Sequence, residues 1–172
     1  ADAARESLDQ AIRQQERLLA RQPDDESLQA DLALSIAGMG SVQHELKQSA
    51  AAMASFEDAA KRLEQLLAKN TDDERLKLRL AMVLNNWAGE HVSKRPGEAA
   101  RLHGRAVELL RKLAAADTAN VPVQRDLALS LNNLGAALAR SGETHRARQM
   151  YVEAIEMRRE LVKAAPARAA YK

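Results

Sequence analysis

The sequence repeats itself with a period close to 48 residues, and this repeat limits what the chain can fold into. The hexapeptide that begins at Asp31 returns in similar form at Arg79 and again at Asp126, at spacings of 48 and 47 residues. A second series of similar segments has the same period, and its members contain Leu8, Phe56, His103 and Tyr151. Self-similarity at such a spacing is the signature of an array of stacked structural units.

Each unit is predicted to contain two α-helices. Strong helix formers, above all Ala and Leu, dominate the sequence, whereas aromatic residues make up only 2% of it. In the last unit, apolar residues recur in three- and four-residue steps, as on one face of a helix: Ala147, Tyr151, Ala154, Ile155 and Leu161. We expect one type of helix, called A, at 25–46, 72–94 and 120–141, and a second type, called B, at 3–21, 50–69, 97–115 and 143–164.

Helix-breaking residues separate most of these predicted helices. Pro23 precedes the first A helix, Pro96 lies between the second A helix and its B partner, and Gly142 lies between the third pair. The join at residues 47–49 contains neither Gly nor Pro, so it is the boundary that the sequence indicates most weakly.

Small, apolar and aromatic residues recur at matching positions of the three units. Those of the last unit are Leu131, Leu134, Gly135, Gly142, Ala147, Tyr151 and Ala154. Those of the earlier units are Leu84, Trp87, Ala88, Ala99, His103 and Ala106, and Ile36, Met39, Gly40, Ala52, Phe56 and Ala59. In this pattern the sequence resembles the tetratricopeptide repeat family. The resemblance implies an all-α fold, a right-handed α-solenoid of antiparallel helix pairs with seven helices in about three and a half repeats.

The unit is longer than the roughly 34 residues of a standard tetratricopeptide repeat. The additional residues correspond to about two further turns in each helix. In this respect the chain resembles the long-helix repeats of large bacterial regulatory proteins, and its richness in Ala and Arg also suggests a bacterial source. A HEAT or armadillo solenoid, with units of roughly 40–47 residues, is the alternative fold.

We expect one repeat domain over residues 1–172, as a section of a longer array. A half repeat at 3–21 precedes repeats at 24–69, 72–115 and 120–164, and 165–172 matches the linker that opens each A helix. The first helix has no A partner, and the last B helix offers an apolar stripe to a neighbour. Terminal units of solenoids normally have a polar outer face, so self-association through exposed array ends is a further expectation.

Composition and charge argue against several classes of protein. The net charge is +2 and aromatic residues are scarce, which disfavours a nucleic-acid-binding surface. The chain has no Cys, and it has no apolar run near the roughly 20 residues that cross a membrane. A cytoplasmic location and no membrane partner are therefore expected.

No residues in the sequence form a recognisable catalytic or metal-binding motif. The four His residues are scattered, with no two at an i, i+4 spacing and no Cys beside them. His103 takes the aromatic packing position of its unit, so burial in the core is the favoured interpretation, and His145 is expected on the surface. We predict no metal, no cofactor and no enzyme activity.

Paired asparagines in two A helices are the candidate binding residues. Asn85 and Asn86 recur as Asn132 and Asn133 at the same place in the next unit. Asn is a poor helix former, so its amides are expected either to bind a partner's backbone or to form hydrogen bonds between helices. The predicted partner-binding groove therefore contains Arg79, Asn85, Asn86, Arg125, Asn132 and Asn133.

The function favoured by the sequence is a protein–protein interaction scaffold that holds a protein or peptide segment in the concave groove of the solenoid. Such a scaffold is expected to be a section of a larger regulatory protein. A nucleic-acid-binding helical solenoid and a structural or self-associating spacer are the alternatives.

Overall fold

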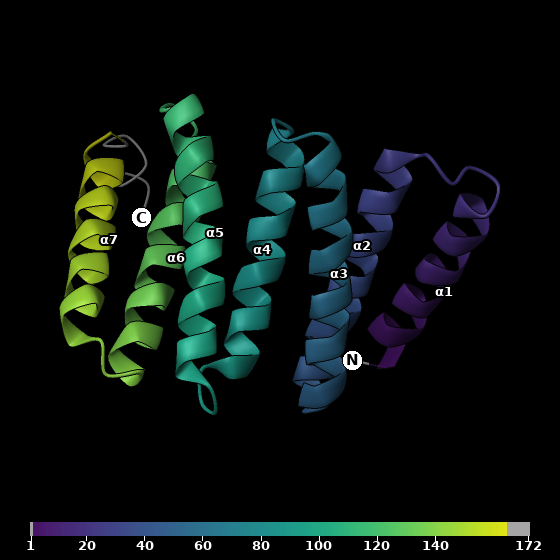
Figure 1. Cartoon of the computed structure of the whole chain (residues 1–172), viewed down its shortest axis with the longest axis horizontal. Helices are drawn as coiled ribbons and strands as arrows, with labels where there is room; N and C mark the ends of the chain where they lie inside the picture. Colours follow the sequence, from purple (N-terminus) through teal and green to yellow (C-terminus); the bar gives the residue numbers. More distant parts are fainter. Residues whose placement is uncertain (1, 165–172) are drawn as a thin grey trace, which may run out of the picture. The chain divides into compact units, whose positions relative to one another are not determined.

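A computed structural model of the chain describes residues 2–164, and these form seven α-helices and no strand (Figure 1). The helices are α1 (Asp2–Leu19), α2 (Glu26–Glu45), α3 (Ser49–Lys69), α4 (Glu74–His91), α5 (Pro96–Ala116), α6 (Val121–Arg140) and α7 (Thr144–Ala164). The predicted all-α fold is confirmed. The chain divides into two compact units, Ala1–Glu90 and His91–Lys172, and each is described by itself. The segment 165–172 lies outside the described residues.

The A helices α2, α4 and α6 each begin after a side chain that caps the helix. Asp25 accepts a hydrogen bond from the backbone N–H of Leu28 at 2.9 Å, and Asp73 accepts one from Leu76 at 3.0 Å. Asn120 does the same for Val123 at 3.2 Å. At this position, the oxygen of a short side chain accepts a hydrogen bond from a backbone N–H that has no partner inside the helix. The three A helices therefore begin 48 and 47 residues apart for a local chemical reason.

One predicted boundary was wrong. The A helix expected at 72–94 ends at His91, whose carbonyl accepts hydrogen bonds from the backbone N–H groups of Lys94 and Arg95. Pro96 disfavours helical geometry at the residue before it, and it then opens α5 as one of the first helical residues. The chain therefore leaves the helix one turn earlier than hydrophobic periodicity alone suggests.

In both units, a glycine of an A helix lies directly against an aromatic ring of the following B helix. A Cβ atom built on Gly40 would lie 2.9 Å from Cε1 of Phe56, and one on Gly135 would lie 2.9 Å from Cε1 of Tyr151. Phe56 is 2% exposed, so its ring fills the interface between α2 and α3. The absence of a side chain on the glycine allows this close helix packing.

Small side chains on the B helices complete the same interfaces. These residues are 0–2% exposed, and they are Ala52 and Ala59 in α3 and Ala147 and Ala154 in α7. The spacing of the two alanines in each helix is the one by which the sequence resembles the tetratricopeptide repeat. In the first unit α2 packs against α1 and α3, and in the second α6 packs against α5 and α7.

We predict that Gly135→Ala destabilises the protein by ~1–3 kcal/mol, because the new methyl group would overlap the Tyr151 ring. Gly104→Ala is the matched control, since Gly104 lies within α5 and a Cβ atom there would meet nothing within 4 Å. It is expected to stabilise the protein by up to ~1 kcal/mol through helix propensity alone. Urea unfolding of both variants measures the two changes, and equal effects would contradict the packing argument.

The A–B turns of the first and third helix pairs have the same hydrogen bonds but different residues. After α2, the N–H of Gln48 donates to the carbonyl of Gln43 and that of Lys47 donates to His44. After α6, Glu143 and Gly142 make the equivalent bonds to Leu138 and Ala139. Both are Schellman turns, which need a left-handed residue after the helix.

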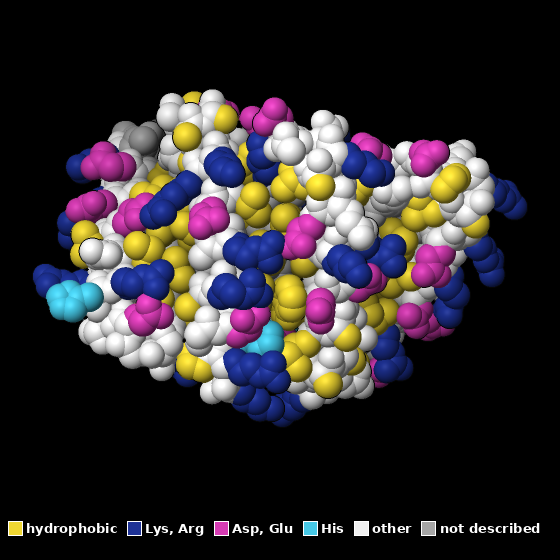
Figure 2. All heavy atoms as spheres, in the orientation of Figure 1, with side chains coloured by type: hydrophobic (Ala, Val, Ile, Leu, Met, Phe, Trp, Pro, Cys, Tyr) yellow, Lys and Arg dark blue, Asp and Glu magenta, His cyan; other side chains and the backbone are white. Residues whose placement is uncertain are grey.

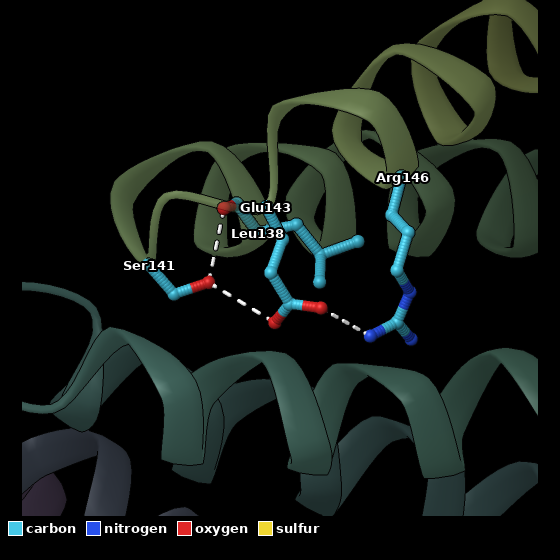
Figure 3. Close-up of polar contacts among 4 residues, drawn as sticks. All are labelled: Leu138, Ser141, Glu143 and Arg146. Atoms are coloured by element: carbon cyan, nitrogen blue, oxygen red, sulfur yellow. Dashed lines mark hydrogen bonds and ion pairs between the residues drawn. The ribbon is translucent and has the colours of Figure 1, made fainter.

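Side chains reinforce the second of these turns (Figure 3). The Ser141 hydroxyl donates to the Leu138 carbonyl at 2.9 Å and lies 3.3 Å from a carboxylate oxygen of Glu143. Arg146 pairs with the same carboxylate. These contacts hold the start of α7 against the end of α6.

Lys47 takes the left-handed position with φ +60°, whereas Gly142 takes it with φ +88°. We predict that Lys47→Gly stabilises the protein by ~0.5–1 kcal/mol, because the left-handed conformation is costly for a residue that has a Cβ atom. The converse change, Gly142→Ala, should cost ~1 kcal/mol although a Cβ there would meet nothing within 4 Å. Thermal unfolding of both variants would show opposite shifts, and a destabilised Lys47→Gly variant would refute the argument.

Candidate functional site

The outward face of α4 and that of α6 carry the same order of side-chain types. In α4 an exposed apolar residue, Met82, is followed one turn later by Asn86 and then by Gly89. In α6 the equivalent residues are Leu129, Asn133 and Ala136. Steps of four and three residues place each set on one side of its helix. We call these sets the α4 strip and the α6 strip, one in each unit.

Met82 is 53% exposed and Leu129 is 52% exposed. Large apolar side chains with this exposure are common singly on protein surfaces. Here they recur at one position of the repeat, 47 residues apart. The remaining A helix, α2, has half-buried Leu34 at the matching position. A repeated exposed apolar position on the A helices is a feature that the sequence analysis missed, although the register of the repeat could have revealed it.

The structure separates the members of the first asparagine pair. Asn86 is exposed within the α4 strip, whereas Asn85 is half-buried one residue before it. Asn132 and Asn133 are both half-buried in α6. The two pairs thus differ in exposure, and Asn86 is the most exposed of the four asparagines.

The two arginines of the predicted groove also differ. Arg79 pairs with Asp31 of α2 at 3.0 Å, so it links two A helices within the first unit. Arg125 is exposed one turn before Leu129 and extends the α6 strip with a positive charge. Two of the predicted residues, Arg125 and Asn133, thus lie on one face of α6. Leu129, which was not predicted, lies between them on that face.

A buried carboxylate that the sequence analysis did not single out joins three helices of the first unit. The side chain of Glu90 is 4% exposed, and it pairs with His44. It also accepts a hydrogen bond from the Ser49 hydroxyl at 2.6 Å. Ser49 opens α3, whose N-cap Gln48 makes no side-chain cap bond, so Glu90 places negative charge where the dipole of α3 favours it. Because the serine and the histidine both bind the carboxylate, this cluster is structural.

Titratable groups in the described part of the chain do not gather into a metal site. Within residues 2–164, no three His, Asp or Glu side chains come together in a way that could hold a metal ion. No helix in the same range is long and apolar enough to cross a membrane. Figure 2 shows Lys and Arg interspersed with Asp and Glu among hydrophobic side chains, rather than a face of one charge.

His103 is buried, as predicted, with 3% of its surface exposed. Burial disfavours the charged imidazolium and lowers the pKa of His103 to about 4. His145 is exposed at the start of α7, also as predicted. His103 therefore has a packing role in α5, at the position that an aromatic ring takes in α3 and α7.

We predict that stability falls by ~2 kcal/mol between pH 7 and pH 5 because of His103. The unfolded imidazole takes up a proton near pH 6.5, whereas the folded one stays neutral down to about pH 4. The unfolded state therefore binds more protons in this range, and stability is lost as the pH falls. Urea unfolding across this range should show a smaller loss for His103→Leu, and identical slopes for both proteins would contradict the prediction.

Comparison with known proteins identifies a family for part of the chain. Residues 127–166 match the tetratricopeptide repeat family, over a segment that includes most of α6 and all of α7. No curated protein matches the chain. The solved structures similar to the chain include the crystal structure of MamA, with 17% identity, a TM-score of 0.40 and coverage of 91% of each chain. They also include BtubC (BKLC) from P. vanneervenii, with 13% identity, a TM-score of 0.31 and coverage of 93% of this chain and 91% of that one.

Proposed function

We propose that the α4 strip and the α6 strip each bind a segment of a partner protein, because residues 127–166 match the tetratricopeptide repeat family and the preceding helices repeat its pattern. Repeats of this family are protein-interaction scaffolds and are generally non-catalytic. In this chain, the residues of the α4 strip and the α6 strip are proposed to make the contact. It also keeps the sequence-based expectations of a section of a larger regulatory protein and of a cytoplasmic setting.

The observation that carries the proposal is the repeated exposure of Met82 and Leu129. Each offers apolar surface that a partner side chain could cover, at about 25 cal/mol for each Å² removed from water. Met is flexible and polarisable, so Met82 can adapt to more than one partner side chain. Each strip could bind one apolar side chain of a partner segment.

Polar and small groups beside the apolar residues favour binding to a backbone. An asparagine amide has both donors and an acceptor, so Asn86 and Asn133 can satisfy the N–H and C=O groups of an extended or helical segment. Gly89 and Ala136 follow one turn later, and their small size leaves room for a main chain to approach. Arg125 would add an attraction to a carboxylate of the partner.

We predict that Met82→Gln with Leu129→Gln weakens partner binding at least roughly ten-fold while barely changing the melting temperature, because both side chains are half exposed. Peptides selected from a random library on the immobilised wild-type chain serve as probes, and calorimetry measures their affinity. Glu108→Gln is the control, since Glu108 is exposed on the B helix α5. Equal affinity for the strip variant and the control would overturn the proposal.

The double variant Asn86→Ala with Asn133→Ala decides the role of the amides. If they bind the partner, affinity falls and the melting temperature stays within a degree or two of wild type. If they bond between helices, buried groups lose their partners and each site costs ~1–3 kcal/mol of stability. Lost stability with unchanged peptide affinity would assign the asparagines to packing. Binding of an oligonucleotide with a steep salt dependence would instead support the nucleic-acid alternative.

A further inference from the structure

The two compact units carry opposite net charges, which the total of +2 conceals. Residues 2–90 contain 11 Lys and Arg against 16 Asp and Glu, a net charge of −5. Residues 91–164 contain 13 against 8, a net charge of +5. Opposite net charge on two parts of a protein promotes association of one copy's acidic part with another copy's basic part.

The outward face of α7 carries a stripe of apolar and positive side chains. The stripe follows steps of four and three residues, and its exposed members are Arg148, Val152, Ile155, Arg159 and Val162. The three apolar side chains are 45%, 48% and 72% exposed. Among residues 2–164, neither Arg148 nor Arg159 has an ion-pair partner, and the stripe contains no carboxylate.

The outward face of α1 carries a stripe with the same spacing and mostly negative charge. Its exposed members are Asp2, Glu6, Asp9, Arg13 and Glu16. Asp2 pairs with Arg5, whereas Glu6 and Glu16 have no ion-pair partner within residues 2–164. None of the side chains of α1 is fully buried, so this helix is covered on one side only.

We propose that the α7 stripe of one copy of this chain binds the α1 stripe of a second copy, with the two helices antiparallel. This direction places Arg148 opposite Glu16 and Arg159 opposite Glu6, since the two arginines are 11 residues apart on one helix and the two glutamates 10 apart on the other. It also places Val152 against the aliphatic stem of Arg13, which long side chains use to cover apolar surface. The parallel direction would instead set Arg159 against Arg13.

Such an interface is heterologous, because two different surfaces meet. Each copy keeps one free α1 stripe or one free α7 stripe, so association continues into open chains unless the geometry closes a ring. Exposed ion pairs contribute only ~0.2–1 kcal/mol each, so the association is weak and sensitive to salt. The interface uses neither the α4 strip nor the α6 strip, so it is independent of the function proposed above.

Charge reversal on each stripe tests the proposal. Sedimentation velocity of the full chain at about 0.05 M salt should show mass rising with concentration, and about 0.5 M salt should return it to monomer. Arg148→Glu with Arg159→Glu, or Glu6→Arg with Glu16→Arg, should each weaken association roughly ten-fold or more. An equimolar mixture of these two variants should assemble again, because each copy then has a complementary stripe for the other.

Lys94→Glu with Lys112→Glu is the matched control, since it reverses two exposed charges of the same unit outside the stripe. It should retain most of the association, and circular dichroism should show the same helix content for all variants. A wild-type chain that stays monomeric at every concentration in low salt would overturn the proposal. So would association that survives the α1 reversal, which would indicate contact between two α7 stripes.

Discussion

The contact between a glycine of an A helix and an aromatic ring of the next B helix sets the geometry of the helix pairs. Gly40 against Phe56 and Gly135 against Tyr151 leave no room for even a methyl group. Close helix approach then allows the small Ala side chains of α3 and α7 to pack with little exposed surface. In the middle repeat of the sequence, Ala88 takes the glycine position and His103 takes the aromatic position.

In α6 the same geometry leaves another side of the helix accessible: Gly135 faces the Tyr151 ring of α7, whereas Leu129 is exposed. In α4, Met82 and Asn86 are exposed. An exposed apolar residue thus recurs at one repeat position of the two helices. The turns matter for the same reason: Lys47 and Gly142 in left-handed conformation direct each B helix back along its partner.

Charge is distributed on a longer scale than the repeat. The nearly equal totals of basic and acidic residues suggest a neutral surface, yet residues 2–90 and residues 91–164 differ by ten charges. Because the A and B helices of every repeat have the same apolar positions, their exposed positions are free to differ in charge without affecting the fold. The outward faces of α1 and α7 show this difference in charge, because α1 exposes mainly carboxylates and α7 exposes arginines.

The sequence by itself determined the helix pairs, their order, the glycine–aromatic register and the burial of His103. These features depend on local periodicity and on comparison between repeats, and both can be read from the sequence alone. Only the tertiary structure decided that Arg79 pairs with Asp31 and that Glu90 gathers His44 and Ser49. These partners lie more than forty residues apart in all three cases. Side-chain pairing across helices depends on how neighbouring repeats are rotated against each other, which is a property of the packed array.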